Sequence, residues 1–317
     1  MMSKIATAPL GPLSVSRLGY GAMGLSSVYG AADDSESLKT LERAVELGIT
    51  FFDTADVYGQ GHNETLLGRF LKGRRDKLVV ATKFGGGGIR NGSASSIAQL
   101  ADESLARLGI DVIDLYYLHR VDQTVSIEDT VGALSRLVEA GKVRAIGLSE
   151  ASAATIKKAH AVHPLAALQT EYSLWTRDVE AEILPLTREL GIGFVAYSPL
   201  GRGFLAGRVA EGEGDRRSVH PRFQPDAVAA NTARKAVIDG VAKRLGASSA
   251  QIALAWVLAK GVVPIPGTRH IHNLEANVAA LDIQLDEATL AELDSAFPAG
   301  STAGERYPTE QLSKVNG

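Results

Sequence analysis

The chain has 317 residues, of which 45% are hydrophobic and 22% are charged, the composition of a globular protein with a large core. Lys and Arg number 33 and Asp and Glu number 36, so the formal charge of −3 lacks the basic excess that binds nucleic acid or an anionic membrane. The absence of cysteine excludes disulfides, thiolate nucleophiles and cysteine-ligated metals. No segment resembles a signal peptide or a membrane span, so we expect a cytoplasmic protein.

Short runs rich in β-branched residues alternate with amphipathic stretches along the chain. The predicted strands are residues 17–22, 50–53, 78–83, 112–119, 143–149, 165–170, 193–198 and 262–267. The predicted helices are residues 34–47, 64–71, 95–108, 127–140, 151–160, 179–190, 232–245, 274–280 and 287–296. Several strands are apolar throughout, which is typical of strands covered on both faces, and several helices end at a glycine.

Eight strands, each followed by a helix, predict an α/β fold of the (β/α)8 TIM-barrel type, with one domain over residues 1–317. An open, doubly wound sheet is the alternative. Residues 9–15 predict a small N-terminal hairpin that caps one end of the barrel. Residues 200–231, after the seventh strand, are too long for an ordinary connection, so we expect a functional or disordered loop there. The last helix is followed by a tail from Phe297 that we expect to be irregular.

Several familiar motifs are absent or lack their context. Residues 19–24 match the glycine-rich dinucleotide motif GxGxxG, but no helix signal follows at once, as that motif requires. The chain has neither a GxSxG nor an HExxH motif. The pairs His160 and His163, and His270 and His272, have no partners at metal-ligand spacing. We therefore expect no metal site.

Four reactive side chains fall at the ends of three consecutive predicted strands. Asp53 ends the second strand and Tyr58 follows it; Lys83 ends the third, and His119 ends the fourth. In a barrel of this type the chemistry lies at the C-terminal ends of the strands, so these groups should converge. Each residue alone has an ordinary structural explanation. Their conjunction predicts a catalytic site that holds a carboxylate, a phenol, an amine and an imidazole.

The sequence around these residues resembles the aldo-keto reductase superfamily. The segments FFDTADVYG, ATKFG, DLYYLHR, GLSE, QTEYSLW, AYSPLGRGFL and IPGTR occur in the family's order, between LGYGAMGL and AGERYP. RFQP together with AGERYP resembles the plant, fungal and bacterial branch of aldehyde and ketone reductases. The resemblance covers essentially the whole chain. It implies a nicotinamide-dependent oxidoreductase with a small-molecule carbonyl substrate.

The resemblance implies that Asp53, Tyr58, Lys83 and His119 form the catalytic tetrad. Tyr58 would donate a proton to the carbonyl oxygen while hydride from C4 of the nicotinamide reaches the carbonyl carbon. We expect the Lys83 ammonium to lower the pKa of Tyr58, and Asp53 to pair with Lys83. His119 would hold the carbonyl in place.

The resemblance also assigns the cofactor site. Tyr197 would stack on the nicotinamide, and Ser149 and Gln169 would hold its carboxamide, although Glu150 stands where other branches have Asn. The remaining assigned cofactor contacts are Gly21, Met23, Asp53, Ser198, Pro199, Leu200, Gly201, Gly203, Gly267, Thr268, Arg269 and Asn277.

Other residues bear on which cofactor is preferred and on where the substrate binds. Asn273 and Ala276 replace the Arg and Glu that the family often has, whereas Arg269 is present, so we expect NADPH, with NADH also accepted. Tyr29, Trp175 and Tyr307 are candidates for the substrate pocket. The arginines of residues 200–231 could attract an acidic substrate, but we interpret them as part of a solvated surface loop, because acidic residues lie among them.

Two other functions are compatible with the same residues. Relatives of this family serve as cofactor-sensing subunits of potassium channels, and the site would also support an alcohol or sugar dehydrogenase that works in the oxidative direction. The sequence leaves the reaction direction, the substrate and the oligomeric state open.

Overall fold

Eight parallel strands form the centre of the molecule. Each strand pairs with the strands that precede and follow it in the chain. The computed structural model describes residues 5–26, 28, 30, 32–86, 94–209 and 215–315. The strands are β3 (Tyr20–Gly21), β4 (Phe51–Asp53), β5 (Val79–Phe84), β6 (Ile113–Leu118), β7 (Val143–Ser149), β8 (Ala167–Glu171), β9 (Gly193–Tyr197) and β10 (Val263–Pro264). This order confirms the predicted (β/α)8 barrel, although the first and last strands are shorter than expected.

The first and last strands meet at a seam that glycine makes possible. Gly19 N donates to the Pro264 carbonyl at 2.9 Å, and Gly21 N donates to the Pro266 carbonyl at 3.4 Å. A Cβ on Gly21 would lie 2.7 Å from the Ile265 carbonyl oxygen, closer than real Cβ contacts come. The glycines in this part of the sequence therefore allow two backbones to approach closely and close the barrel.

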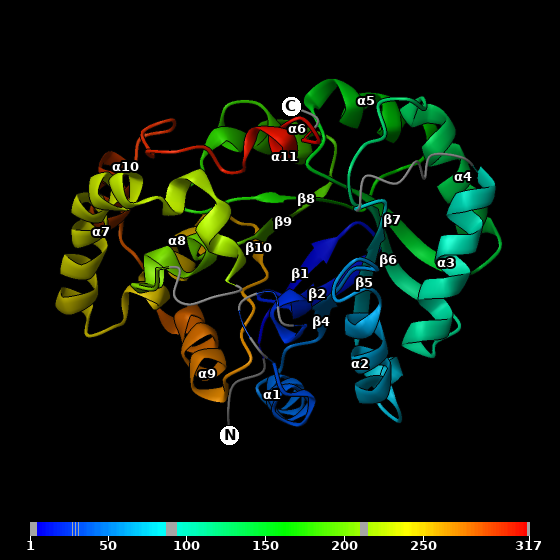
Figure 1. Ribbon diagram of the computed structural model, residues 1–317, viewed down its shortest axis with the longest axis horizontal. Helices are drawn as coiled ribbons and strands as arrows, with labels where there is room; N and C mark the ends of the chain where they lie inside the picture. Colours follow the sequence, from blue (N-terminus) through cyan, green and yellow to red (C-terminus); the bar gives the residue numbers. More distant parts are fainter. Residues whose placement is uncertain are drawn as a thin grey trace.

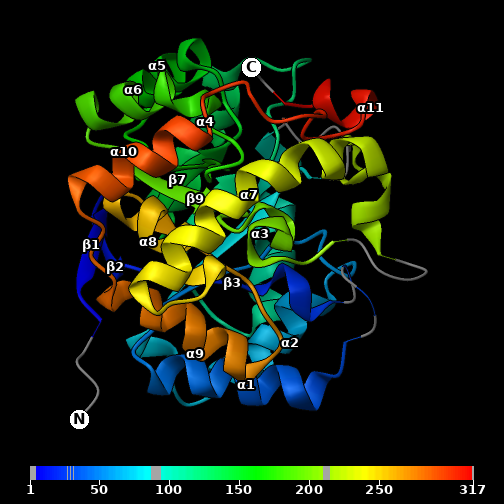
Figure 2. The same ribbon diagram turned by 90° about the vertical axis from the view of Figure 1, so that its left-hand side faces the viewer.

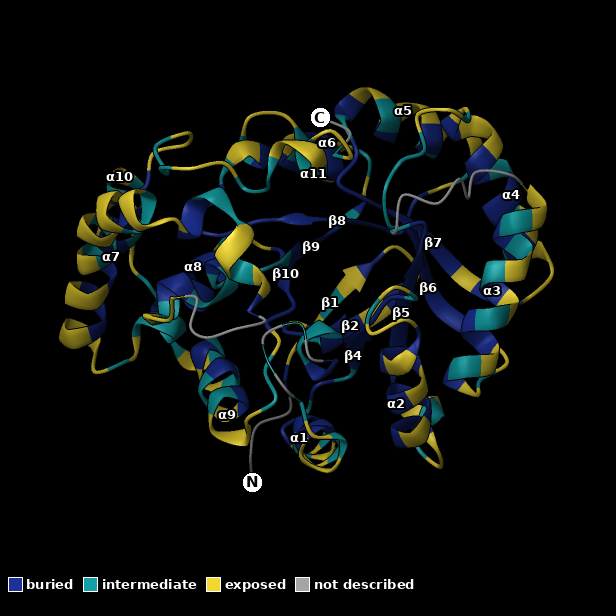
Figure 3. Ribbon diagram, in the orientation of Figure 1, coloured by how far each residue is buried: buried dark blue, intermediate teal, exposed yellow. Residues whose placement is uncertain are grey.

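Helices surround the strands and turn their exposed faces outward (Figure 1; Figure 3). They are α1 (Asp34–Glu46), α2 (His62–Leu71), α3 (Ala94–Leu108), α4 (Ile127–Glu139), α5 (Ala153–Val162), α6 (Ile183–Glu189), α7 (Pro225–Leu245), α8 (Ser249–Ala259), α9 (Ile271–Ala279), α10 (Glu287–Ala296) and α11 (Thr309–Leu312). Side-chain caps fix several N-termini; Ser248 and Gln251, for example, cap α8 reciprocally. The glycines predicted to end helices, such as Gly48 and Gly141, have positive φ.

The predicted hairpin consists of β1 (Thr7–Leu10) and β2 (Leu13–Ser16), which pair antiparallel. Its side chains Leu10, Leu13 and Val15 belong to the same buried cluster as Phe51 and Leu115 from inside the barrel. The hairpin therefore closes the N-terminal end of the barrel. In Figure 2 it lies at the left edge, opposite α11 at the right, which leaves the C-terminal ends of the strands to the loops and the tail.

The segment after β9 differs from the prediction. Helix α7 begins at Pro225, seven residues before the predicted start, so the loop after this strand ends at Gln224 rather than at Asn231. Asn231 lies buried in the helix and exchanges hydrogen bonds of 2.9 and 3.0 Å with the Ala303 backbone of the tail. A buried asparagine with a distant partner gives a loop signal in the sequence, which explains the error.

Two further elements complete the description. Helix α8 was not among the predicted helices, because its near-continuous apolar sequence has no amphipathic period; seven of its residues are buried. Within the described ranges, no helix is both long and apolar enough to cross a membrane.

Candidate active site

The four predicted catalytic residues meet at the C-terminal end of the barrel. Lys83 Nζ lies 2.5 Å from Asp53 Oδ1, 2.7 Å from the Thr54 carbonyl oxygen and 3.5 Å from Tyr58 Oη. The Lys83 and Asp53 side chains are only 1% and 3% exposed. Strands β4 and β5 are adjacent and place Asp53 and Lys83 near their ends. The convergence inferred from the strand ends is therefore observed for the amine, the carboxylate and the phenol.

Burial and charge oppose each other at this cluster. Burial disfavours the charge on Lys83, but Asp53 and Tyr58 outweigh it, and the pKa of Lys83 lies above its ordinary value. Burial is the largest effect on Tyr58 and raises its pKa, whereas the nearby Lys83 lowers it by less. Lys83 therefore lowers the pKa of Tyr58 as predicted, but burial outweighs this effect and the net shift is upward. Tyr58 carries its proton at neutral pH, and Lys83 reduces the cost of losing it.

His119 follows β6 and faces the same space. Its ring lies 6.0 Å from that of Tyr58, edge to face. Burial, followed by the charges of Arg120 and Lys83, holds the pKa of His119 well below its usual value, so the imidazole is neutral. Its buried Nδ1 has no hydrogen-bond partner in the described part of the chain. Gly86 packs against that nitrogen so closely that a Cβ there would overlap it.

Two predicted carboxamide ligands flank the tetrad. Gln169 Nε2 donates to Asp53 Oδ2 at 2.7 Å, which orients the carboxylate that faces Lys83. Ser149 is the last residue of β7, and its Oγ accepts a hydrogen bond from Arg120 at 3.2 Å. Both side chains are buried and line the cavity beside the tetrad.

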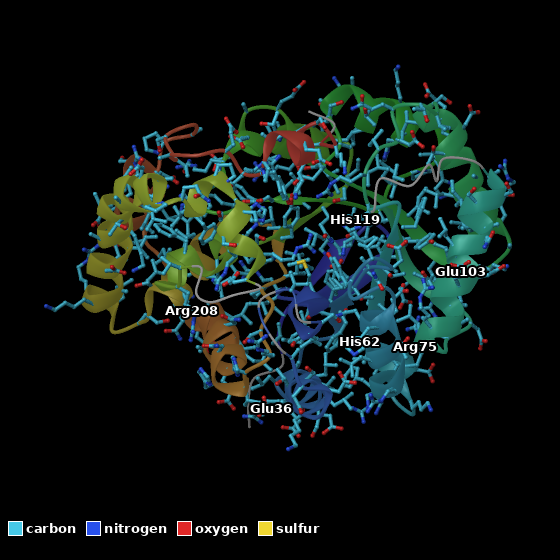
Figure 4. All side chains as sticks on the ribbon, viewed as in Figure 1. Glu36, His62, Arg75, Glu103, His119 and Arg208 are labelled. Carbon is cyan, nitrogen blue, oxygen red and sulfur yellow. The ribbon has the colours of Figure 1, made fainter. Side chains whose placement is uncertain are left out.

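A large cavity of about 1240 Å³ opens over these residues and extends to helix α9. Figure 4 shows His119 near the middle of the view and Arg208, which also lines the cavity, well to its left. The predicted cofactor residues that line it are Gly21, Met23, Asp53, Ser149, Gln169, Tyr197, Ser198, Pro199, Leu200, Gly203, Gly267, Thr268, Arg269 and Asn277. Two predicted site residues do not line it: Lys83 lies behind Tyr58, and Gly201 packs on Trp175.

The arm of the cavity away from the tetrad is basic. Its cationic lining residues include Arg208, Arg216, Arg217, Lys243 and Arg269. Arg217 pairs with Asp215 at 2.6 Å. A long cavity with glycines at its wall and arginines at its far end fits a dinucleotide with phosphates. Asn273 and Ala276 line this arm without adding charge.

The structure places the described candidates for the substrate pocket differently, Tyr307 on the wall of the cavity and Trp175 away from it. Tyr307 lines the cavity, and its hydroxyl lies 2.8 Å from the Tyr197 hydroxyl. Trp175 is buried and stacks on Phe204 with ring centroids 4.2 Å apart, so it is a packing residue. Tyr29 lies outside the described residues.

A buried ionic network joins the tail to the barrel, and the sequence reasoning missed it. Glu150 accepts from Arg306 at 3.0 and 2.9 Å and from the Tyr197 hydroxyl at 2.8 Å. Glu171 pairs with Arg202 at 2.9 Å. The Arg202 side chain is 7% exposed, which contradicts the interpretation that it is solvated, whereas Arg208 and Arg216 are exposed as expected.

One signal for this network was present in the sequence: Glu150 departs from the asparagine of other branches. Its partner lies 156 residues away, so the sequence could not identify it. Glu150 also has a positive φ of 54°, as does Ser198 at 49°. Such strained backbones tend to occur at functional sites, and both residues directly follow barrel strands.

Comparisons with known proteins agree on one family. A model of the "Aldo/keto reductase family" matches residues 17–297. The chain is 50% identical over 306 residues to "Probable aldo-keto reductase 1" of Glycine max, which covers 92% of this chain and 88% of that protein. The fold of this chain is similar to that of a glycerol dehydrogenase from Gluconobacter oxydans, with a TM-score of 0.82, 27% identity and coverage of 93% of this chain and 95% of that chain. It is also similar to an aldo/keto reductase from Klebsiella pneumoniae in complex with NADP and acetate, with a TM-score of 0.74, 27% identity and coverage of 96% and 99%.

Proposed function

Because this chain belongs to the aldo/keto reductase family, we propose that it is an NADPH-dependent oxidoreductase that reduces aldehydes or ketones to alcohols, with Tyr58 as the proton donor. One observation carries the proposal. Lys83 Nζ touches both Asp53 and Tyr58 beneath a cavity of about 1240 Å³ that His119 also lines. This arrangement places a buried ion pair beside a proton donor and leaves room for both a cofactor and a substrate.

The residues of the cavity fit NADPH. Tyr197, Ser149 and Gln169 lie together at the tetrad end and would hold the nicotinamide, while Arg208 and Arg269 at the far end would hold phosphates. Structural neighbours in complex with NADP or NADPH support this assignment. When bound, the cofactor supplies the hydride that reduces the carbonyl carbon.

Tyr58 supplies the proton that balances the reaction. Its pKa lies above the ordinary value because it is buried, so the hydroxyl is protonated across the neutral range. As negative charge develops on the substrate oxygen, the hydroxyl donates to it and Lys83, 3.5 Å away, stabilises the resulting phenolate. Asp53 keeps Lys83 charged in its buried position. The neutral His119 offers a second hydrogen bond with which to orient the carbonyl.

A second direction of the same reaction deserves a test, since one structural neighbour is a glycerol dehydrogenase. In that direction Tyr58, as its phenolate, accepts the proton of an alcohol. The residues and their geometry are the same in both directions. Assays with NADP⁺ and primary alcohols would therefore be run beside the reductive assays.

The test is the loss of NADPH absorbance at 340 nm with a panel of aldehydes. Wild type should turn over at least one of them, and Tyr58→Phe should lose about 10²–10⁴ in kcat, the contribution of a positioned acid. Tyr116→Phe is a matched control, because Tyr116 is buried against Phe84 and does not line the cavity. An active Tyr58→Phe variant, or a wild type that neither binds NADPH nor turns over any carbonyl or alcohol, contradicts the proposal.

A further inference from the structure

Arg120 places a second cation beside the tetrad. It directly follows His119 at the end of β6 and lines the same cavity. Its NH1 group donates to the His119 carbonyl at 2.7 Å and to Ser149 Oγ at 3.2 Å. These two contacts fix the guanidinium between the catalytic imidazole and the predicted carboxamide site. They use only NH1 of a group that carries five N–H donors.

No carboxylate of the protein pairs with this guanidinium in the described part of the chain. The carboxylates near the tetrad have other partners. Asp53 pairs with Lys83, and Glu150 forms a two-point ion pair with Arg306. Glu171 pairs with Arg202. A partly buried arginine without an acidic partner is unusual, because burial of a cation is unfavourable unless an anion compensates.

The field around Arg120 also favours its charged form. Burial lowers the pKa of Arg120, but the groups around it, among them the Glu150 carboxylate, raise it above its ordinary value. His119 beside it is neutral and adds no competing charge. The guanidinium is therefore a fixed positive charge on the wall of the cavity, next to where a carbonyl must sit to reach Tyr58 and His119.

We propose that Arg120 binds a carboxylate carried by the carbonyl substrate, so that the enzyme prefers oxo acids and aldehydes with a carboxylate over neutral carbonyls. A carboxylate matches the planar, two-point geometry of a guanidinium with free N–H groups. The inference rests on the proposed reductase function and specifies its substrate class. It assigns Arg120 to substrate selection rather than to proton transfer.

The experiment compares each carboxylate with a neutral molecule of nearly the same shape. The 2-, 3- and 4-carboxybenzaldehydes and their methyl esters would be assayed with NADPH, so that three spacings between the carbonyl and the anion are sampled. We expect wild type to favour at least one acid over its ester in kcat/KM. Arg120→Met should lower kcat/KM for that acid by about tenfold to a hundredfold, the range for a charge-assisted hydrogen bond, and change the ester by less than about threefold.

Further variants and readouts separate substrate binding from structural roles. Arg120→Lys keeps the charge and should restore part of the preference for the acid. Benzoate should inhibit wild type more strongly than benzamide does, and this difference should vanish in Arg120→Met. The Kd for NADPH should be unchanged. Arg74→Met is the matched control, because Arg74 lies on the surface near Glu42 and does not line the cavity.

Two outcomes would overturn the inference, and they differ from a failure of the proposed function. If acids and esters are reduced equally by wild type, or if Arg120→Met lowers both to the same extent, Arg120 only positions His119 or Ser149. A weakened Kd for NADPH would likewise assign it to the cofactor. If wild type reduces other aldehydes but neither these acids nor their esters, the inference alone is contradicted. If circular dichroism shows wild type folded, yet it neither binds NADPH nor turns over any carbonyl or alcohol, the reductase function itself is contradicted.

Discussion

Asp56, between the predicted catalytic residues Asp53 and Tyr58, is expected to make the stability of the protein depend on pH. Its Oδ1 accepts from Val57 N at 2.7 Å, and its own N donates to the Lys83 carbonyl at 3.1 Å. Burial, followed by the nearby carboxylate of Glu64, raises its pKa from 3.8 to about 6. The folded protein therefore retains a proton at this site over a pH range in which the unfolded chain has lost it.

The sign and size of the effect follow from this difference. The stability that comes from the protonated carboxyl is complete below pH 3.8 and is lost as the pH rises through about 6. Each unit of difference between the folded and unfolded pKa values of Asp56 changes the free energy of unfolding by about 1.4 kcal/mol. Ionised Asp56 therefore lowers the free energy of unfolding by at most about 3 kcal/mol above pH 6. Asp56→Asn keeps an oxygen that can accept from Val57 N and removes the charge. It should be more stable than wild type by about 1 kcal/mol at pH 4.5 and by about 3 kcal/mol at pH 8.

The measurement is urea unfolding followed by circular dichroism at pH 4.5, 6 and 8. Asp76→Asn is the matched control, since it makes the same change at an exposed position. An advantage of Asp56→Asn that does not grow with pH would refute the reasoning. So would a loss of stability at pH 8, because it would mean that the ionised carboxylate is stabilised by Lys83 or Arg107 more than burial opposes it.

Two further predictions concern the positioning of the site. Gly86→Ala should push the His119 ring aside and lower kcat by about tenfold or more. Gly132→Ala, in open space on α4, should leave kcat unchanged. Equal kcat in the two variants would show that the backbone at Gly86 shifts and leaves the His119 ring in place. Arg306→Met leaves Glu150 buried without its cation, a loss of about 3–5 kcal/mol, so the tail should undock and limited proteolysis should cut it faster than in wild type. An unchanged cleavage rate would contradict the role of this ion pair in holding the tail.

The sequence was sufficient where chain order determines position. Residues at the ends of adjacent parallel strands must meet, so the contacts of Asp53 and Lys83 follow from the strand assignment alone. The hairpin and the glycines that end the helices follow from local backbone preferences. The family resemblance added Tyr197, Ser149 and Gln169, which all line the cavity.

The sequence was insufficient where a side chain's partner lies far along the chain. Glu150 and Arg306 are 156 residues apart, and neither residue alone indicates an ion pair. Asn231 looked like a loop residue because its partner, the Ala303 backbone, lies in the tail. The net direction of the Tyr58 pKa depends on how much burial outweighs one ammonium, a balance that needs coordinates.

The same barrel end therefore holds two kinds of ion pair with different consequences. Asp53 and Lys83 both belong to strands at the centre of the barrel, so the positions of these two buried side chains are set by the pairing of β4 and β5. Glu150 follows a barrel strand but Arg306 belongs to the tail, so this pair can break without disturbing the strands. It also contacts Tyr197, whose hydroxyl bonds both Glu150 and Tyr307. We therefore expect a change in the tail to alter the surroundings of Tyr197, at the predicted nicotinamide site, more than those of Tyr58 and Lys83.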